Sequence, residues 1–210
     1  DALEKLVVMD KVELIDRSEE LKLISVHGPK VRQLVEIAFN QEAPEKFLSH
    51  VSVTLGGRSA VWIRLNLIGE TGYGFLIPKT QTAAFRSALE QHGGAFGLIP
   101  IQSETLEILR IEAGIPRYGI DFDESHMPLE AGLEKSVSFA KGCFPGQEIL
   151  ARLDSRGGGA KKLMGIVLKG ETAPKRNDRI TQNGNEVGRI TSGTFSPSLK
   201  KTIAMGYFKK

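Results

Sequence analysis

The stretch KGCFPGQE, residues 141–148, says more about the fold than any other part of this chain, and it contains the only cysteine, Cys143. A lone thiol cannot form an internal disulfide, so its value lies in packing or in reactivity. Pro145 suits the first turn of a helix, which residues 147–153 are predicted to form. A thiol just before a helix N-terminus, with Lys141 two residues away, favours a reactive thiolate. Burial as a small apolar residue is the alternative.

Composition around this stretch is typical of a globular protein. The chain has 210 residues, of which 40% are hydrophobic and 25% charged, and this leaves ample material for a core. No apolar run approaches the roughly 20 residues that a membrane-spanning helix needs. One cysteine excludes a disulfide scaffold and fits a reducing compartment. We therefore expect no membrane contact and a cytoplasmic protein, or a mitochondrial or plastid matrix protein in a eukaryote.

Charge is distributed unevenly although the net charge is only +3. Basic residues prevail from residue 152 to residue 179, opposed only by Asp154, Glu171 and Asp178. Such a run can meet a polyanionic ligand tail, RNA or an acidic partner, or it can be a solvated linker. No aromatic residue interrupts it, which argues against base stacking. We expect no direct nucleic-acid partner.

Strand and helix patterns alternate through the first 112 residues. Two amphipathic stretches flank a β-rich segment, and the helix that starts after Pro29 is expected to turn one apolar face inward. The predicted strands cover residues 11–16, 21–26, 51–55, 60–67 and 75–77, with Gly56-Gly57 joining the third and fourth, and further helices end near residue 92 and cover 104–112. Helices without regular βαβ repetition indicate an α+β fold with antiparallel sheets.

The run Gly157-Gly158-Gly159 is the clearest boundary in the sequence. Short strands separated by turns follow it, and Asn183-Gly184 is a strong hairpin signal between two of them. The predicted strands cover residues 163–168, 179–181, 186–191 and 203–208. We therefore predict an α+β region over residues 1–158 and a small all-β, barrel-like module over residues 159–210.

Residues 141–148 resemble the signature of YgfZ-type folate-binding proteins, which are relatives of the glycine cleavage T-protein, an aminomethyltransferase. The resemblance continues through LRIEAGIPRYG at residues 109–119, PLEAGL at 128–133 and VGRITSG at 187–193. It implies a T-protein-like folate-binding fold. It also implies a chain that lacks the N-terminal part of that fold, where the catalytic aspartate of the aminomethyltransferase lies, and that is cut short at Lys210.

The same resemblance implies a tetrahydrofolate site. Glu70, in the stretch 68–75, matches the family's pterin-binding glutamate, whose carboxylate accepts two parallel hydrogen bonds; an exposed turn glutamate is the alternative. The chain departs from the family at Leu67-Ile68, where Tyr-Thr is usual. Arg110 matches a folate-contacting arginine, and its alternative is a salt bridge with Glu107 or Glu112.

Further site residues are predicted from the same blocks. Cys143 and Lys141 are the catalytic candidates. The additional folate-binding candidates are Tyr118, Gln147, Glu148 and Arg152. The ring of Tyr118 would form an aromatic wall of the site. The four histidines have no metal-site spacing, and one thiol cannot hold an iron–sulfur cluster, so no metal site is predicted.

Two functions follow from the resemblance. The first is a tetrahydrofolate-binding, YgfZ-type protein that supports iron–sulfur cluster assembly or repair, with iron–sulfur client or assembly proteins as partners and an indirect effect on tRNA modification. The second is a folate-dependent aminomethyltransferase or a related one-carbon transferase, which would act on an aminomethylated lipoyl carrier protein. The residues leave open whether the chain is an enzyme and what its oligomeric state is.

Overall fold

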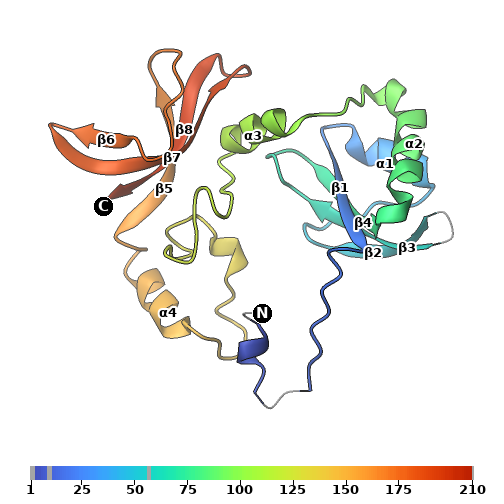
Figure 1. The fold of residues 1–210 in the computed structure, drawn as a ribbon, viewed down its shortest axis with the longest axis horizontal. Coiled ribbons are helices and arrows are strands. Elements are labelled where there is room, and N and C mark those ends of the chain that lie inside the picture. Colours follow the sequence, from blue (N-terminus) through green and yellow to red (C-terminus); the bar gives the residue numbers. More distant parts are fainter. Residues whose placement is uncertain (1–2, 9–10, 56–57, 210) are drawn as a thin grey trace. The chain divides into compact units, whose positions relative to one another are not determined.

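The computed structural model describes residues 3–8, 11–55 and 58–209, in two compact units (Figure 1). The first unit contains Asp1–Asn66 and Glu70–Pro100, and the second contains Leu67–Gly69 and Ile101–Lys210. Each unit has one four-stranded antiparallel sheet with helices beside it. The α+β class and the antiparallel sheets predicted from the sequence are confirmed.

The sheet of the first unit has the strand order β1-β4-β3-β2. Its strands are β1 (Leu21–His27), β2 (His50–Leu55), β3 (Arg58–Leu65) and β4 (Gly72–Pro78). Side chains alternate between the two faces of a strand. One face therefore carries Trp62 and Phe75, which are fully buried and whose rings stack 5.2 Å apart.

Two helices complete the core of this unit. In α1 (Val31–Phe39) the buried residues Val31, Leu34 and Val35 follow the helical spacing of one apolar face. Helix α2 (Thr82–Gly93) adds Phe85 and Leu89, and Phe85 lies 4.7 Å from the ring of Phe75. Helices α1 and α2 therefore cover the aromatic face of the sheet, and this is why Trp62 and Phe75 are buried.

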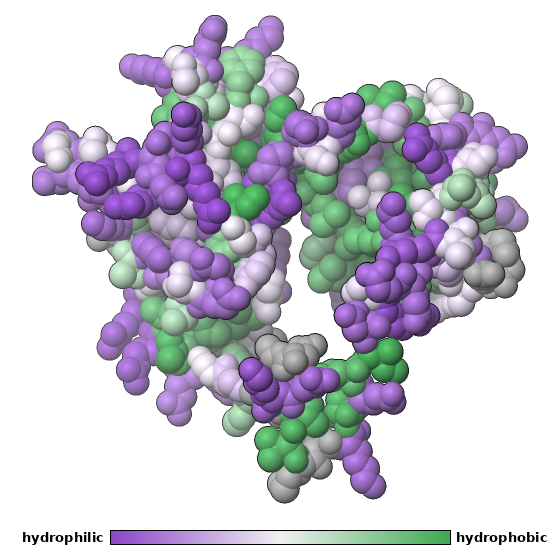
Figure 2. Space-filling model, in the orientation of Figure 1, coloured by the Kyte–Doolittle hydropathy of each residue, from purple (hydrophilic) through white to green (hydrophobic). Residues whose placement is uncertain are grey.

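The other face of this sheet stays more open. Alternation places Leu23, Ile63, Leu65 and Leu76 on it; Leu23 is exposed and the other three are half-buried. A Cβ at Gly74 would meet the side chains of Leu65 and Leu23, so these leucines lie across the backbone of β4. Figure 2 shows that apolar residues, in green, are among those at the surface of this unit.

The second unit has the strand order β5-β8-β7-β6. Its core includes Ile111, Ile203 and Met205, with Leu163 packed against them. The elements are α3 (Ser103–Glu112), α4 (Gln147–Ser155), β5 (Lys161–Leu168), β6 (Arg179–Gln182), β7 (Asn185–Ser196) and β8 (Lys201–Lys209). The all-β, barrel-like module predicted at the C-terminal end corresponds to these four strands.

Short 3₁₀ helices complete the elements: Glu4–Leu6, Lys79–Gln81, Gly94–Phe96 and Glu134–Ser136. The strand predicted over residues 11–16 is wrong: these residues form no regular element and all six side chains are exposed. Alternation alone does not make a strand, because a strand needs a neighbour for its hydrogen bonds. The Gly56-Gly57 connection lies outside the described residues.

The division between units near residue 100 differs from the boundary predicted at residues 158 and 159. In the structure, Gly157 and Gly158 both have positive φ, at +76° and +103°, and follow Arg156, the C-cap of α4. The glycine run therefore ends a helix inside the second unit. The boundary between an α+β region and a β module at this point stays a prediction.

Candidate functional site

Glu70 lies on the connection between β3 and β4 in the first unit. The last pair of these strands is Leu65 with Gly72, so residues 66–71 form the turn. The side chain of Glu70 is exposed, and among the described residues no hydrogen bond or ion pair engages its carboxylate. The carboxylate can therefore accept donors from a ligand without first breaking a contact.

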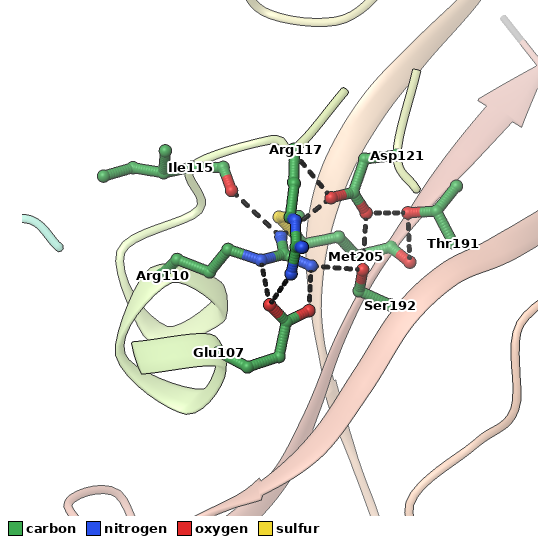
Figure 3. A network of polar contacts seen from close by, with 8 residues as sticks. All are labelled: Glu107, Arg110, Ile115, Arg117, Asp121, Thr191, Ser192 and Met205. Atoms are coloured by element: carbon green, nitrogen blue, oxygen red, sulfur yellow. Dashed lines mark hydrogen bonds and ion pairs between the residues drawn. The ribbon is translucent and has the colours of Figure 1, made fainter. Parts of the chain in front are cut away.

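Arg110 belongs to the second unit, where its guanidinium is buried in a polar network (Figure 3). Nε donates to Glu107 at 2.8 Å, Nη1 donates to Asp121 at 2.7 Å, and Nη2 donates to Ser192 at 2.9 Å. A second bond to Glu107 and one to the Ile115 carbonyl complete the set. All five N–H donors thus have acceptors, and the salt bridge with Glu107 is formed.

Asp121 is the centre of this network and was missed from the sequence. It is fully buried, and besides Arg110 it accepts hydrogen bonds from the backbone N–H of Arg117 and from the hydroxyls of Thr191 and Ser192. The network therefore ties α3 and the loop after it to β7, across about 70 residues of sequence. Its only sequence signal is that both partner segments lie in the blocks 109–119 and 187–193.

Electrostatics within the network follow from these contacts. The hydrogen bond from Arg110 lowers the pKa of Glu107 below its usual value. Burial acts to lower the pKa of Arg110, but the hydrogen bond to Glu107 and the charge of Asp121 raise it overall. Both groups therefore stay ionised, as a buried ion pair requires.

Tyr118 lies in the loop after α3 and is 58% exposed. Its hydroxyl donates a hydrogen bond to Glu124, and this bond raises the pKa of the phenol. The ring meets Phe122 edge to face, with centroids 5.5 Å apart. Tyr118 is therefore reachable from solvent, and its role as an aromatic wall stays a prediction.

Cys143 is exposed in the loop before α4. Gly146, with φ +84°, is the N-cap of that helix, so the helix begins at Gln147 as predicted and the thiol lies four residues before its first residue. The ammonium of Lys141 lies 4.5 Å from the centroid of the Phe144 ring. The thiol is thus reachable from solvent, and Lys141 contacts the aromatic neighbour.

Gln147, Glu148 and Arg152 lie along α4, which buries only Leu150. Gln147 is half-buried, while Glu148 and Arg152 are exposed. Together with Cys143, these residues belong to the second unit, whereas Glu70 belongs to the first. Most of the candidates therefore lie in the second unit, but among the described residues the partners of Arg110 are Glu107, Ile115, Asp121 and Ser192, and none of the candidates in or before α4 is among them.

A cavity of about 140 Å³ lies in the second unit and contains none of these candidates. Its lining mixes acidic and basic side chains with the glycine run: Leu129, Glu134, Asp154, Gly157, Gly158, Gly159, Lys161 and Lys162. Across residues 3–8, 11–55 and 58–209, no cluster of three or more His, Cys, Asp or Glu residues could hold a metal ion. None of the described helices is long and apolar enough to cross a membrane.

Two family descriptions match almost the whole chain. Residues 1–141 match the GCVT N-terminal domain, and residues 161–210 match the glycine cleavage T-protein C-terminal barrel domain. The chain belongs to the glycine cleavage T-protein family. The two matches leave out residues 142–160, which contain Cys143, α4 and the glycine run.

Curated relatives within this family are named aminomethyltransferase. One from Symbiobacterium thermophilum is 34% identical over 205 residues, which is 95% of this chain and 54% of the relative. One from Halothermothrix orenii is 33% identical over 200 residues, 95% of this chain and 56% of the relative. The chain thus spans about half the length of the curated relatives it matches.

A solved structure of the family shares the fold. The crystal structure of glycine cleavage system aminomethyltransferase T from Bartonella henselae has a TM-score of 0.77 with this chain, at 22% sequence identity. The match covers 90% of this chain and 52% of that protein. The T-protein-like fold predicted from the sequence is therefore confirmed.

These comparisons correct the first function predicted from the sequence. Support of iron–sulfur cluster assembly, with iron–sulfur partners and a tRNA link, is wrong as the leading function, because relatives that match along 95% of the chain are named aminomethyltransferase. The prediction gave eight residues, 141–148, more weight than the likeness of the remaining chain. The T-protein family is shown, and none of the comparisons singles out the YgfZ-type subgroup.

Proposed function

We propose that this chain is part of a folate-dependent aminomethyltransferase of the T-protein family. The observation that carries the proposal is the likeness to proteins of that name over 95% of the chain, at 34% and 33% identity. In the reaction, an aminomethyl group leaves a lipoyl carrier thiol, its carbon passes to tetrahydrofolate as a methylene group, and ammonia is released.

Glu70 is our candidate for holding the pterin. Its exposed carboxylate has free acceptor positions, and the amino-pyrimidinone edge of a pterin offers two adjacent N–H donors, the geometry that a carboxylate accepts best. Beside the turn, the sheet face with Leu23, Leu65 and Leu76 is apolar and open, which suits a flat ring. Glu70 therefore supplies orientation, and the leucines supply contact area.

Other predicted roles stay proposals. A folate contact by Arg110 requires one of its five hydrogen bonds to open, so Arg110 acts first as a support for its own unit. The subgroup likeness of residues 141–148 and the catalytic part of the exposed thiol are likewise predictions. The remaining candidate roles concern Lys141 in catalysis and Tyr118, Gln147, Glu148 and Arg152 in folate binding.

Calorimetric titration with tetrahydrofolate tests the proposal. Trp62 is fully buried in the core, so heat is a better signal than tryptophan emission. We expect saturable binding, and we expect Glu70→Gln to weaken it about tenfold to a hundredfold, since a hydrogen bond to a charged group contributes about 1.5–3 kcal/mol.

Glu13→Gln, an exposed change in the same unit, is the matched control and should bind as the unchanged chain does. Release of ammonia and methylene-tetrahydrofolate from an aminomethylated lipoyl carrier protein then tests the transfer itself. If the chain shows no saturable heat with tetrahydrofolate, or if both variants bind equally well, the proposed role of Glu70 is lost.

A further inference from the structure

Arg64 directs its guanidinium at the turn that carries Glu70. It is the next-to-last residue of β3, and Nη1 donates to the Leu65 carbonyl at 2.6 Å and to the Gly72 carbonyl at 2.9 Å. Nη2 donates to the Thr71 hydroxyl at 3.3 Å. Leu65 and Gly72 are the pair that closes the hairpin, so one side chain bridges both ends of residues 66–71.

The guanidinium of Arg64 forms no salt bridge with a carboxylate among the described residues. Its side chain is nevertheless half-buried. Its other close neighbour is the ring of Tyr73, 5.3 Å from the guanidinium carbon. The acceptors of its side-chain hydrogen bonds are Leu65, Thr71 and Gly72, which lie in the turn or at its ends. This is expected of a charged group that holds the turn in place.

His27 covers the same backbone from β1. A Cβ at Gly72 would come within 2.1 Å of its Nδ1, so the imidazole lies directly against that glycine. The neighbouring Gly28 donates its N–H to the Thr71 carbonyl at 2.9 Å. Thr71 and Gly72, which follow Glu70 directly, are thus held by Arg64 on one strand and by the end of β1 on another.

From this geometry we propose that Arg64 is a positioning residue, which fixes the turn so that Glu70 presents its carboxylate to the pterin in one orientation. This inference rests on the proposed function of Glu70. A planar group with several donors is needed to reach three acceptors, so lysine cannot replace Arg64. Ordering the turn before binding lowers the entropy cost that the ligand would otherwise meet.

A double-mutant cycle separates positioning from simple stabilisation. Arg64→Met keeps the aliphatic stem, and we expect it to weaken tetrahydrofolate binding about tenfold, as loss of hydrogen bonds worth about 1.4 kcal/mol implies. Arg64→Lys should not rescue binding. In a Glu70→Gln background, Arg64→Met should change affinity less than about twofold, because the group that it positions is gone.

Thr71→Val is the milder companion variant, since it removes one acceptor and leaves the core untouched. Its effect on affinity should be smaller than that of Arg64→Met and should also vanish in the Glu70→Gln background. Equal losses in both backgrounds would mean that Arg64 acts without Glu70, and unchanged binding by Arg64→Met would overturn the inference directly.

Hydrogen exchange without ligand keeps the two proposals distinguishable. The Gly28 amide reports on the turn through its bond to Thr71, and Arg64→Met should speed its exchange about tenfold while amides in the middle of β4 keep their rates. If the unchanged chain fails to bind tetrahydrofolate, the proposed function falls. If the Gly28 amide exchanges at the same rate in both proteins, Arg64 does not fix the turn and the further inference is wrong.

Discussion

Asp121 is the carboxylate in the second unit that accepts hydrogen bonds from Arg110, Arg117, Thr191 and Ser192. It is fully buried and faces the buried cation of Arg110 at 2.7 Å. Three further donors from Arg117, Thr191 and Ser192 satisfy its remaining lone pairs. A buried pair of this kind contributes little beyond an apolar pair, but removing one partner is costly. Without Asp121, Arg110 keeps Glu107 as its one carboxylate partner among the described residues, and the donors of Arg117, Thr191 and Ser192 lose their shared acceptor.

We therefore expect Asp121→Ala to lower the free energy of unfolding by about 3–5 kcal/mol. Ser192→Ala removes one hydroxyl from the same network and should cost about 1 kcal/mol. Urea unfolding followed by circular dichroism measures both. Glu104→Ala, on the exposed side of α3, is the control and should stay within about 0.5 kcal/mol of the unchanged chain. Similar losses for all three variants would contradict the role of Asp121.

Individual residues were predicted best where their role is local. The salt bridge of Arg110 with Glu107 was one of two alternatives, because residues three apart on a helix are neighbours, and the structure contains it. Asp121 was not anticipated, since its partners lie 11 and about 70 residues away. Spacing along the chain says nothing about such pairs until the fold brings them together.

The hairpin of β6 and β7 shows the same contrast among elements. Asn183 and Gly184 both have positive φ, +52° and +80°, as the predicted two-residue turn demands. The turn could be predicted because it depends on two adjacent residues that both tolerate positive φ. Residues 11–16 alternate as a strand does, yet they have no strand partner, and no local pattern reveals whether a partner exists.

Gly184→Ala should destabilise the second unit by about 1–2 kcal/mol, because an L-residue pays that much for left-handed backbone. Gly165→Ala, on β5, is the matched control: its φ is not positive and a Cβ there meets nothing within 4 Å. The control should be neutral or slightly stabilising. Thermal and urea unfolding of the two variants measure the difference, and equal stability would show that the turn tolerates a side chain.

At the scale of the whole molecule, a break in local structure and a division into compact units are different features. The glycine run at residues 157–159 is a break in local structure, whereas the two compact units separate near residue 100 and the second unit includes Leu67–Gly69. Such a division depends on contacts between distant segments. The family resemblance supplied the fold because it covered the chain widely, and it misled on function where one short motif was given the decisive weight.

The unfolding free energy of the whole chain depends on pH, and individual titratable groups change it over separate pH ranges. Burial, together with the nearby charge of Arg64, lowers the pKa of His27 below its usual 6.5. The unfolded chain therefore takes up a proton near pH 6.5 that the folded chain refuses, and stability falls as the pH drops below that value. Glu107, whose pKa Arg110 lowers, adds a second loss below its ordinary value of 4.5.

We expect His27→Gln to remove the loss of stability just below pH 6.5 and to leave the loss below pH 4.5 unchanged. Between pH 7.5 and pH 5.5, its unfolding free energy should fall less steeply than that of the unchanged chain, by at most about 1.4 kcal/mol per pH unit for one proton. His50→Gln, at an exposed position, should keep the original slope. Urea midpoints measured at pH 7.5, 6.5 and 5.5 decide the matter. Parallel losses in all three proteins would show that the acid response arises at another residue, and that the imidazole against Gly72 can be charged without loosening the turn.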